Sequence, residues 1–216
     1  MGHCLRGKVI GMWKLSKQVM LLGMLVWLSS ACAPNTVYEN EQPPLLTKIP
    51  EPVFREPWLL IDTKADKLIV MQNAQPVEVF HQIAVGSSGA GLKYQRGDNK
   101  TPLGVFRVGW VNDHSRFNKF IGLDYPNPDY AERALREHRI DRSTYERIHS
   151  AWISGRTPPQ DTPLGGQIGI HGVGAGNPRV HEAGIDWTSG CVALDNWQIN
   201  ALRPWIKVSF SPLLAN

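Results

Sequence analysis

Short apolar runs separated by polar turns begin at Trp58 and predict a series of strands. Residues 58–62 and 67–71 are two such runs, joined by the polar turn at residues 63–66. Apolar and polar positions alternate most regularly over residues 77–85, which predicts a third strand, and residues 105–108 predict a fourth. Short, closely spaced strands of this kind are typical of a mostly β domain.

A helical region interrupts the strands between residues 127 and 155. Proline suits the first position of a helix, so Asn127-Pro128 predicts a helix start. The segment from Ser143 to Glu146 fits the capping box of a second helix, and Gly155 is placed to stop it.

The pattern resumes after this insertion. Residues 167–170 predict a strand that delivers His171 at its end, Asp195 or Asn196 is placed to cap a last short helix, and residues 205–210 predict a closing strand. The expected fold is therefore mostly β, with a helical insertion and a short C-terminal helix.

The first 31 residues have the composition of an export signal. They contain four basic residues and no acidic one, followed by an uncharged apolar run of ten residues and then small residues. A membrane-spanning helix needs about 20 residues, so a short membrane helix is the less favoured interpretation. With Cys32 next, the region resembles a bacterial lipoprotein signal. That resemblance implies a lipid on Cys32 and, because Ala33 rather than Asp follows, a periplasmic protein anchored to the outer membrane.

Residues 32–57 are rich in proline and polar residues and predict an extended tether in front of the domain, residues 58–213. The whole chain has 23 basic and 19 acidic residues, and removal of the leader leaves 19 of each. The mature chain is then formally neutral. The pI of about 9.0 gives no support for nucleic-acid binding, which needs a basic patch on the folded domain.

Cysteine usage singles out Cys191. Cys4 lies in the leader and Cys32 at the predicted lipid site, so Cys191 has no partner for a disulfide within the mature chain. Such a cysteine is a crosslink between two copies, a buried passive residue or a reactive group. Its neighbours in the sequence favour the reactive group.

Two segments carry residues suited to thiol chemistry. His171 and Gly172 follow a predicted strand, and glycine there permits a turn and the close approach of a substrate. Residues 188–191 form a small, turn-prone loop that can expose a thiol and aim backbone N–H groups near Gly190 inward. A histidine within reach accepts the thiol proton, and inward N–H groups hold a developing oxyanion. The pattern predicts Cys191 as the nucleophile, His171 as its base and Gly190 as an oxyanion donor.

These residues resemble the L,D-transpeptidase (YkuD-type) family, whose signature is His-Gly, a loop, and Ser/Thr-x-Gly-Cys before a hydrophobic residue. The resemblance extends from about residue 58 to residue 212. It implies a β-sandwich-like catalytic domain that acts without a cofactor or metal and contacts its substrate at Gly172, Thr188 and Ser189. In this family the cysteine attacks a peptidoglycan stem peptide after its diamino acid and expels the terminal D-alanine. The acyl group then passes to an amine, which forms a 3–3 crosslink or attaches a lipoprotein.

The sequence departs from the family pattern at two positions. Ser189 stands where many members have histidine, and Ala193 stands where many have an arginine thought to contact substrate. The segment from Asp186 to Leu194 looks closer to the YafK-like branch, some members of which hydrolyse and release lipoprotein from the wall. Three interpretations stay open: a transpeptidase, a hydrolase of the same family, and a non-catalytic peptidoglycan-binding lipoprotein.

Other polar residues near the motifs receive weaker interpretations. Either His181 or Asp186 could orient His171. His171, His181 and Cys191 together could bind a metal, but three ligands at wide, irregular spacing do not favour it. Asp98 and Thr101 lie in a glycine-rich turn and are given no catalytic role.

Overall fold

The computed structural model describes residues 56–73, 75–176, 178–207 and 212–215, and gives side-chain surroundings only up to residue 207. These residues belong to one unit of the chain, Gln42–Asn216. The predicted export signal, Cys32 and the predicted tether up to residue 55 lie outside the described residues. Within the described part, no helix is both long enough and apolar enough to cross a membrane.

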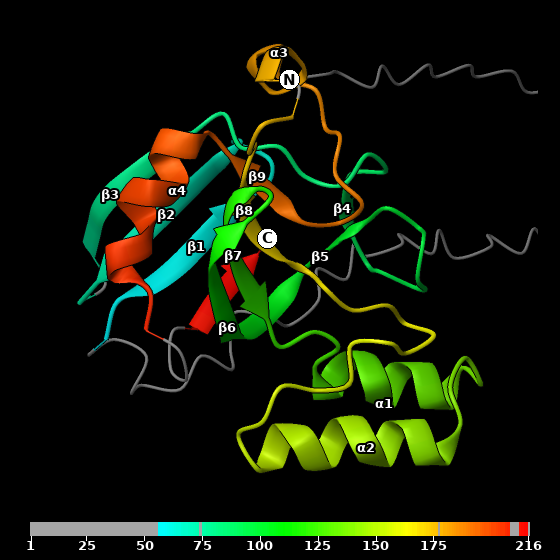
Figure 1. Cartoon of the computed structure of the whole chain (residues 1–216). Coiled ribbons are helices and arrows are strands. Elements are labelled where there is room, and N and C mark those ends of the chain that lie inside the picture. The colour runs from blue at the N-terminus through cyan, green and yellow to red at the C-terminus, as the bar shows by residue number, and fades with distance from the viewer. Residues whose placement is uncertain (1–55, 74, 177, 208–211, 216) are drawn as a thin grey trace, which may run out of the picture. The chain divides into compact units, whose positions relative to one another are not determined.

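Strands dominate the described residues, and helices lie at one side of the sheet and at its end (Figure 1). The strands are β1 (Trp58–Asp62), β2 (Lys67–Gln72), β3 (Gln75–His81), β4 (Ala90–Gly91), β5 (Thr101–Pro102), β6 (Gly104–Ser115), β7 (Asn118–Leu123), β8 (Gly169–Gly172), β9 (Val192–Leu194) and β10 (Pro212–Ala215). The helices are α1 (Pro128–Arg136), α2 (Arg142–Ile153), α3 (Pro178–Glu182), α4 (Asn196–Leu202) and the 3-10 helix Arg203–Trp205. The predicted mostly β fold with a helical insertion and a short C-terminal helix is confirmed.

Eight strands form one sheet in the order β3-β2-β1-β10-β6-β7-β8-β9, and β4 pairs with β5 in a separate ribbon. β10 runs parallel to β1 and antiparallel to β6, so it joins the two halves of the sheet. The segment that follows β3 returns to β9, where Ala84 and Ala193 exchange backbone hydrogen bonds of 3.1 and 2.7 Å. The two ends of the sheet are therefore tied together through backbone hydrogen bonds, which leaves little free edge in this region.

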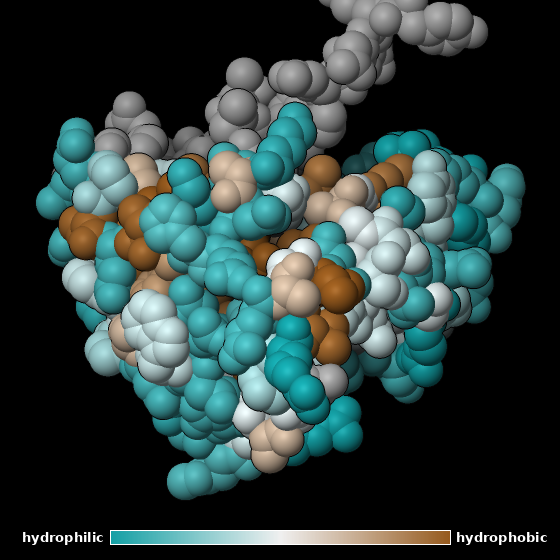
Figure 2. Space-filling model, turned by 90° about the horizontal axis from the view of Figure 1, so that it is seen from above, coloured by the Kyte–Doolittle hydropathy of each residue, from teal (hydrophilic) through white to brown (hydrophobic). Residues whose placement is uncertain are grey.

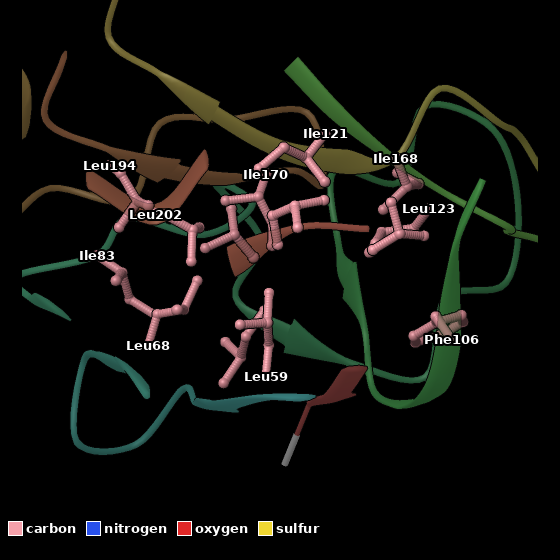
Figure 3. Close-up of a cluster of buried hydrophobic side chains, with 14 of the residues drawn as sticks. Leu59, Leu68, Ile83, Phe106, Ile121, Leu123, Ile168, Ile170, Leu194 and Leu202 are labelled. Carbon is pink, nitrogen blue, oxygen red and sulfur yellow. The ribbon is translucent and has the colours of Figure 1, made fainter. Parts of the chain in front are cut away.

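Apolar side chains from both halves of the sheet meet in one core, shown in Figure 3. Leu59 and Leu68 come from β1 and β2, and Ile121 and Ile170 come from β7 and β8. α4 packs against β7 and β8 and adds Leu202 to the same cluster. Full burial of each such side chain stabilises the fold by about 1.5–3 kcal/mol. The core thus fixes β8, which carries His171, and β9, which follows directly after Cys191.

The helical insertion forms a hairpin of two antiparallel helices beside the sheet (Figure 1). Asn127 caps α1 as predicted, because its side chain accepts a hydrogen bond from the Tyr130 N–H at 3.0 Å. The predicted capping box at Ser143 is wrong. Asp141 is the N-cap of α2 and accepts from the Thr144 N–H at 2.7 Å, so the helix starts earlier than its sequence pattern suggested. Gly155, with a φ of 68°, follows the helix end as predicted.

Three further predictions need correction. The third strand ends at His81 rather than residue 85, because Gln82 takes a φ of 62° that no strand allows. The predicted strand at residues 205–210 is wrong at its start, since Trp205 ends a 3-10 helix, and the last strand is β10. His171 lies within β8 rather than after it. The strand predicted at residues 105–108 continues to Ser115 as β6, and β4, β5, β7, β9 and α3 were not predicted.

The face of the molecule seen in Figure 2 is largely hydrophilic. Apolar residues appear on it in separate groups, and a few of them lie in a hollow near its centre. This scattered distribution of apolar residues differs from the continuous apolar patch that a large permanent protein interface presents.

Candidate active site

Strand register places His171 and Cys191 on one face of the sheet. β8 and β9 run parallel, with His171 opposite Ala193. Paired residues on neighbouring strands point to the same face, and so do residues two apart along a strand. Cys191, two positions before Ala193, therefore faces the same side as His171. Both side chains line one cavity of about 690 Å³.

Aromatic rings hold the His171 imidazole. Phe117 stacks on it with ring centroids 4.3 Å apart, Phe120 lies parallel at 6.1 Å, and Trp187 meets it edge-on at 5.8 Å. Phe120 fits there because its neighbour is Gly169, where a Cβ atom would lie 2.7 Å from the phenyl ring. The ring is buried among these aromatic side chains.

The Gly172 carbonyl orients the His171 ring. It lies 2.7 Å from Nδ1, and a carbonyl only accepts, so Nδ1 carries the hydrogen and Nε2 keeps a lone pair. Burial lowers the pKa of His171 below 6.5, and the positive charge of nearby Arg116 lowers it further. At neutral pH the imidazole is uncharged and able to accept a proton.

The Cys191 thiol is half-buried and lies against the backbone of β8. Its Sγ donates to the Gln167 carbonyl at 3.4 Å. Burial raises the pKa of Cys191 to about 11, although a hydrogen bond from the Gly169 backbone and the positive charge of Lys93 act in the opposite direction. The thiol and the imidazole are therefore both neutral in the protein at rest.

Two buried threonine hydroxyls fix the loop that carries the thiol. Thr188 Oγ1 donates to the Cys191 carbonyl at 2.7 Å and accepts from the Gly190 N–H at 3.1 Å. Thr101 Oγ1 donates to the same carbonyl at 3.3 Å and accepts from the Gly86 N–H at 2.8 Å. Thr101, given no role from the sequence, thus positions the peptide that carries the thiol.

Gly190 has the backbone conformation that only glycine adopts easily. Its φ is 124°, and a Cβ atom there would lie 2.7 Å from the Lys100 carbonyl oxygen. Its N–H, the predicted oxyanion donor, donates to the Thr188 hydroxyl in this structure. Gly190 does not itself line the cavity.

The same loop is tied to the segment after β3. The Ser87 N–H donates to the Thr188 carbonyl at 2.8 Å, and the Thr188 N–H donates to the Val85 carbonyl at 3.1 Å. Asp186 adds a third link, since its Oδ1 accepts from the Val85 N–H at 2.8 Å. Asp186 therefore binds the backbone at Val85. The group that orients His171 is the Gly172 carbonyl, and not Asp186, one of the two candidates from the sequence.

The cavity brings together most of the predicted site residues. The side chains that line it are Trp110, Asn112, His114, Ser115, Arg116, Phe117, Phe120, Gln167, His171, Trp187, Thr188, Ser189 and Cys191. Gly172 does not line it: the space where its Cβ would be is taken by the Phe117 carbonyl and the Asn196 side chain. Gly172 therefore serves close backbone packing around the base. Trp110, Phe117 and Phe120 on the cavity wall were not identified from the sequence, because they lie on β6, β7 and the turn between them, outside both motifs.

His181 lies close to this site but is not part of it. It is buried, and its Nε2 is 3.8 Å from Asp195 Oδ1. Burial lowers its pKa, and the neighbouring carboxylates oppose that effect. Across the described residues no three His, Cys, Asp or Glu side chains are grouped as metal ligands.

Ala193 is fully buried and pairs with Ala84. Its side chain points to the same face as that of His171, its partner on β8, but it does not line the cavity. An arginine in this position would therefore need the surrounding side chains to move.

Comparison with known families decides the classification. A sequence model of the YkuD family, the L,D-transpeptidase catalytic domain, matches residues 56–213. The chain belongs to this family. The YkuD match covers all the described helices and strands except the last two residues of β10.

Several solved structures are similar to this L,D-transpeptidase domain. Bd1075 of Bdellovibrio bacteriovorus is 20% identical, with 76% of this chain and 48% of that chain covered and a TM-score of 0.47. The helical cell shape determining protein Pgp2 of Campylobacter jejuni is 20% identical, with 80% and 54% covered and a TM-score of 0.49. An L,D-transpeptidase of Enterococcus faecium, as its C442S mutant, is 11% identical, with 76% and 51% covered and a TM-score of 0.44. The chain spans about half the length of these structures. A comparison with curated proteins found no match.

Proposed function

We propose that the chain is a cysteine L,D-transpeptidase that acts on peptidoglycan stem peptides. In this proposal Cys191 is the nucleophile and His171 the base, and the bond attacked joins the diamino acid to the terminal D-alanine. The observation that supports it is the placement of the thiol and the imidazole on one face of β8 and β9, in one cavity, with His171 Nδ1 held by the Gly172 carbonyl.

Proton transfer opens the proposed reaction. Both groups are neutral at rest, so the thiol proton moves to His171 Nε2 as the sulfur attacks the substrate carbonyl. A carbon–sulfur bond forms, and the carbonyl oxygen becomes an oxyanion. The imidazolium then gives its proton to the D-alanine nitrogen as the carbon–nitrogen bond breaks, which leaves a thioester on Cys191.

The second half-reaction repeats these transfers in reverse. An amine attacks the thioester, His171 takes a proton from it, and the thiol leaves protonated as the new amide forms. Water in place of the amine gives the free acid, which is the hydrolase alternative. The oxyanion donor remains the Gly190 N–H, and the oxyanion must then share this donor with the Thr188 hydroxyl.

Turnover of a purified tetrapeptide stem tests this function. Cys191→Ser should abolish D-alanine release, and His171→Ala should lower it by a factor of about 100 to 10,000, the range for loss of a general base. His81→Ala, an exposed histidine on β3, is the matched control and should keep wild-type activity. Full activity in the Cys191→Ser variant would rule out Cys191 as the nucleophile, and a wild-type protein that releases no D-alanine would instead favour a wall-binding protein without catalysis. Mass analysis of products with and without an amine separates joining from hydrolysis.

We also propose export and a lipid anchor at Cys32, which the composition of the first 31 residues and the small residues before Cys32 support. The mass of the mature N-terminal peptide from membranes is the test. An unmodified Cys32 in that peptide would contradict the anchor.

A further inference from the structure

One cation lies on the wall of the active-site cavity. Arg116 sits in the turn between β6 and β7, and its side chain is exposed. It lines the 690 Å³ cavity and also a neighbouring cavity of about 310 Å³, and no other lysine or arginine in the described part of the chain lines either. Neither cavity is lined by Asp or Glu. Among the described residues, Arg116 is therefore the one permanently charged side chain on the walls of these two cavities.

Stacking holds Arg116 near the base. Its guanidinium carbon lies 4.7 Å from the centre of the Phe117 ring, and that ring stacks on His171 at 4.3 Å. These two distances place the guanidinium within about 9 Å of the imidazole, a span of two to three extended residues.

The backbone holds this arrangement as well. Gly174, with a φ of 70°, approaches the Arg116 carbonyl so closely that a Cβ atom would lie 2.2 Å from it. At Gly172 a Cβ atom would lie 2.7 Å from the Phe117 carbonyl. The turn that carries Arg116 is therefore packed directly on the end of β8, which carries His171.

Arg116 has no carboxylate to pair with in the described structure. Five other arginines do pair with Asp or Glu; they are Arg107, Arg133, Arg136, Arg139 and Arg203. A guanidinium that lies over a ring does not use up its N–H donors on that ring, and these donors match a carboxylate in a two-point contact. The position and its free donors suit an anionic group of a bound ligand.

We propose that Arg116 binds a carboxylate of the stem peptide and so determines which substrates the enzyme accepts. This inference rests on the proposed function. Ala193 is buried and does not line the cavity, so the cation on the cavity wall is Arg116. Beside the bond that is attacked, a stem peptide offers two such groups, the terminal D-alanine carboxylate and the second carboxylate of the diamino acid, and the proposal concerns these two.

Binding to the full chain in a Cys191→Ser background tests the proposal without requiring turnover. The probes are a tetrapeptide with diaminopimelic acid before D-alanine, the same peptide with its terminal carboxyl amidated, and the same peptide with lysine in place of diaminopimelic acid. Arg116→Gln should weaken binding of the first peptide about tenfold, which is about 1.4 kcal/mol. Arg116→Gln should not weaken binding of the one probe that already lacks the recognised carboxylate. That probe therefore identifies the carboxylate that Arg116 binds.

Arg142→Gln is the matched control. Arg142 is also exposed with its guanidinium over an aromatic ring, 5.7 Å from Tyr145, but it lies on the helical hairpin and lines neither cavity. It should leave binding of all three peptides unchanged. An Arg116→Gln variant that binds all three like the Cys191→Ser parent, or that loses affinity equally for all three, overturns the inference while leaving the proposed function intact. If none of the peptides binds the parent, the proposed function and the inference both fall.

Discussion

The buried ion pair between Lys93 and Asp98 supports the loop on which the nucleophile rests, and its removal should be costly. Lys93 is 2% exposed and Asp98 is 14% exposed. Asp98 also accepts hydrogen bonds from three backbone N–H groups of its own loop, at Tyr94 (2.8 Å), Gln95 (3.2 Å) and Lys100 (3.1 Å). The Lys100 carbonyl in turn lies against Gly190.

Loss of one partner from a buried ion pair costs about 3–5 kcal/mol. Lys93→Met should fall near 3 kcal/mol, because Asp98 keeps its three backbone donors. Asp98→Ala should fall near 5 kcal/mol, since it leaves a buried ammonium without a carboxylate and also removes the loop's hydrogen bonds. Either loss is a large part of the 5–15 kcal/mol that stabilises an ordinary domain.

The free energy of unfolding from urea titrations of the full chain measures both effects. Arg136→Met is the control. Its ion pair with Glu132 is an exposed i,i+4 pair on a helix, and such pairs contribute only about 0.3–0.5 kcal/mol. Burial would raise the pKa of Asp98, but the Lys93 hydrogen bond and the backbone N–H groups hold it below its ordinary 3.8. The stability advantage over Asp98→Ala should therefore persist above pH 3.8 and shrink as pH falls below it. A Lys93→Met protein within 0.5 kcal/mol of wild type would show that this reasoning is wrong.

Two further predictions concern the nucleophile loop. Because the pKa of Cys191 is raised to about 11, the rate of its alkylation by iodoacetamide should keep rising from pH 7 to pH 10, and a plateau with a midpoint below pH 7 would contradict a neutral resting thiol. Gly190→Ala should destabilise the fold by about 1–3 kcal/mol and abolish D-alanine release, because Gly190 has a φ of 124° and the new Cβ would lie 2.7 Å from the Lys100 carbonyl oxygen. Stability is measured by thermal melts. Gly184→Ala, where a Cβ meets nothing within 4 Å, is the control and should cost less stability.

Local patterns predicted the first two strands well. In β2, buried Leu68 and Val70 alternate with more exposed neighbours, and the strand is marked in the sequence by a continuous apolar run between polar turns. The end of β3 could not be predicted in the same way, because it depends on the backbone conformation of Gln82 and not on its polarity. The closing strand was expected too early, from residue 205, because the position of β10 depends on its pairing with β1 and β6, which lie far from it in the sequence.

The motifs identified two side chains but not the contacts that position them. His171 and Cys191 stand out because of the residues beside them in the sequence. Thr101 reaches the Cys191 carbonyl from 90 residues away, and Phe117 stacks on the base from the turn after β6. These contacts depend on how the strands are ordered in the sheet, which no local spacing encodes.

The backbone pairing of Ala84 with Ala193 determines when, during folding, the site around the Cys191 thiol is assembled. The two residues are about a hundred positions apart, and contacts over such a span form late because long loops must close first. The segment before β4 holds the Thr188 backbone, and β9 continues directly from Cys191. A chain that has emerged only as far as β8 therefore has a base but no thiol. The complete site arises in the same step that closes the sheet, so an incompletely folded chain has no assembled catalytic pair with which to acylate itself or its neighbours.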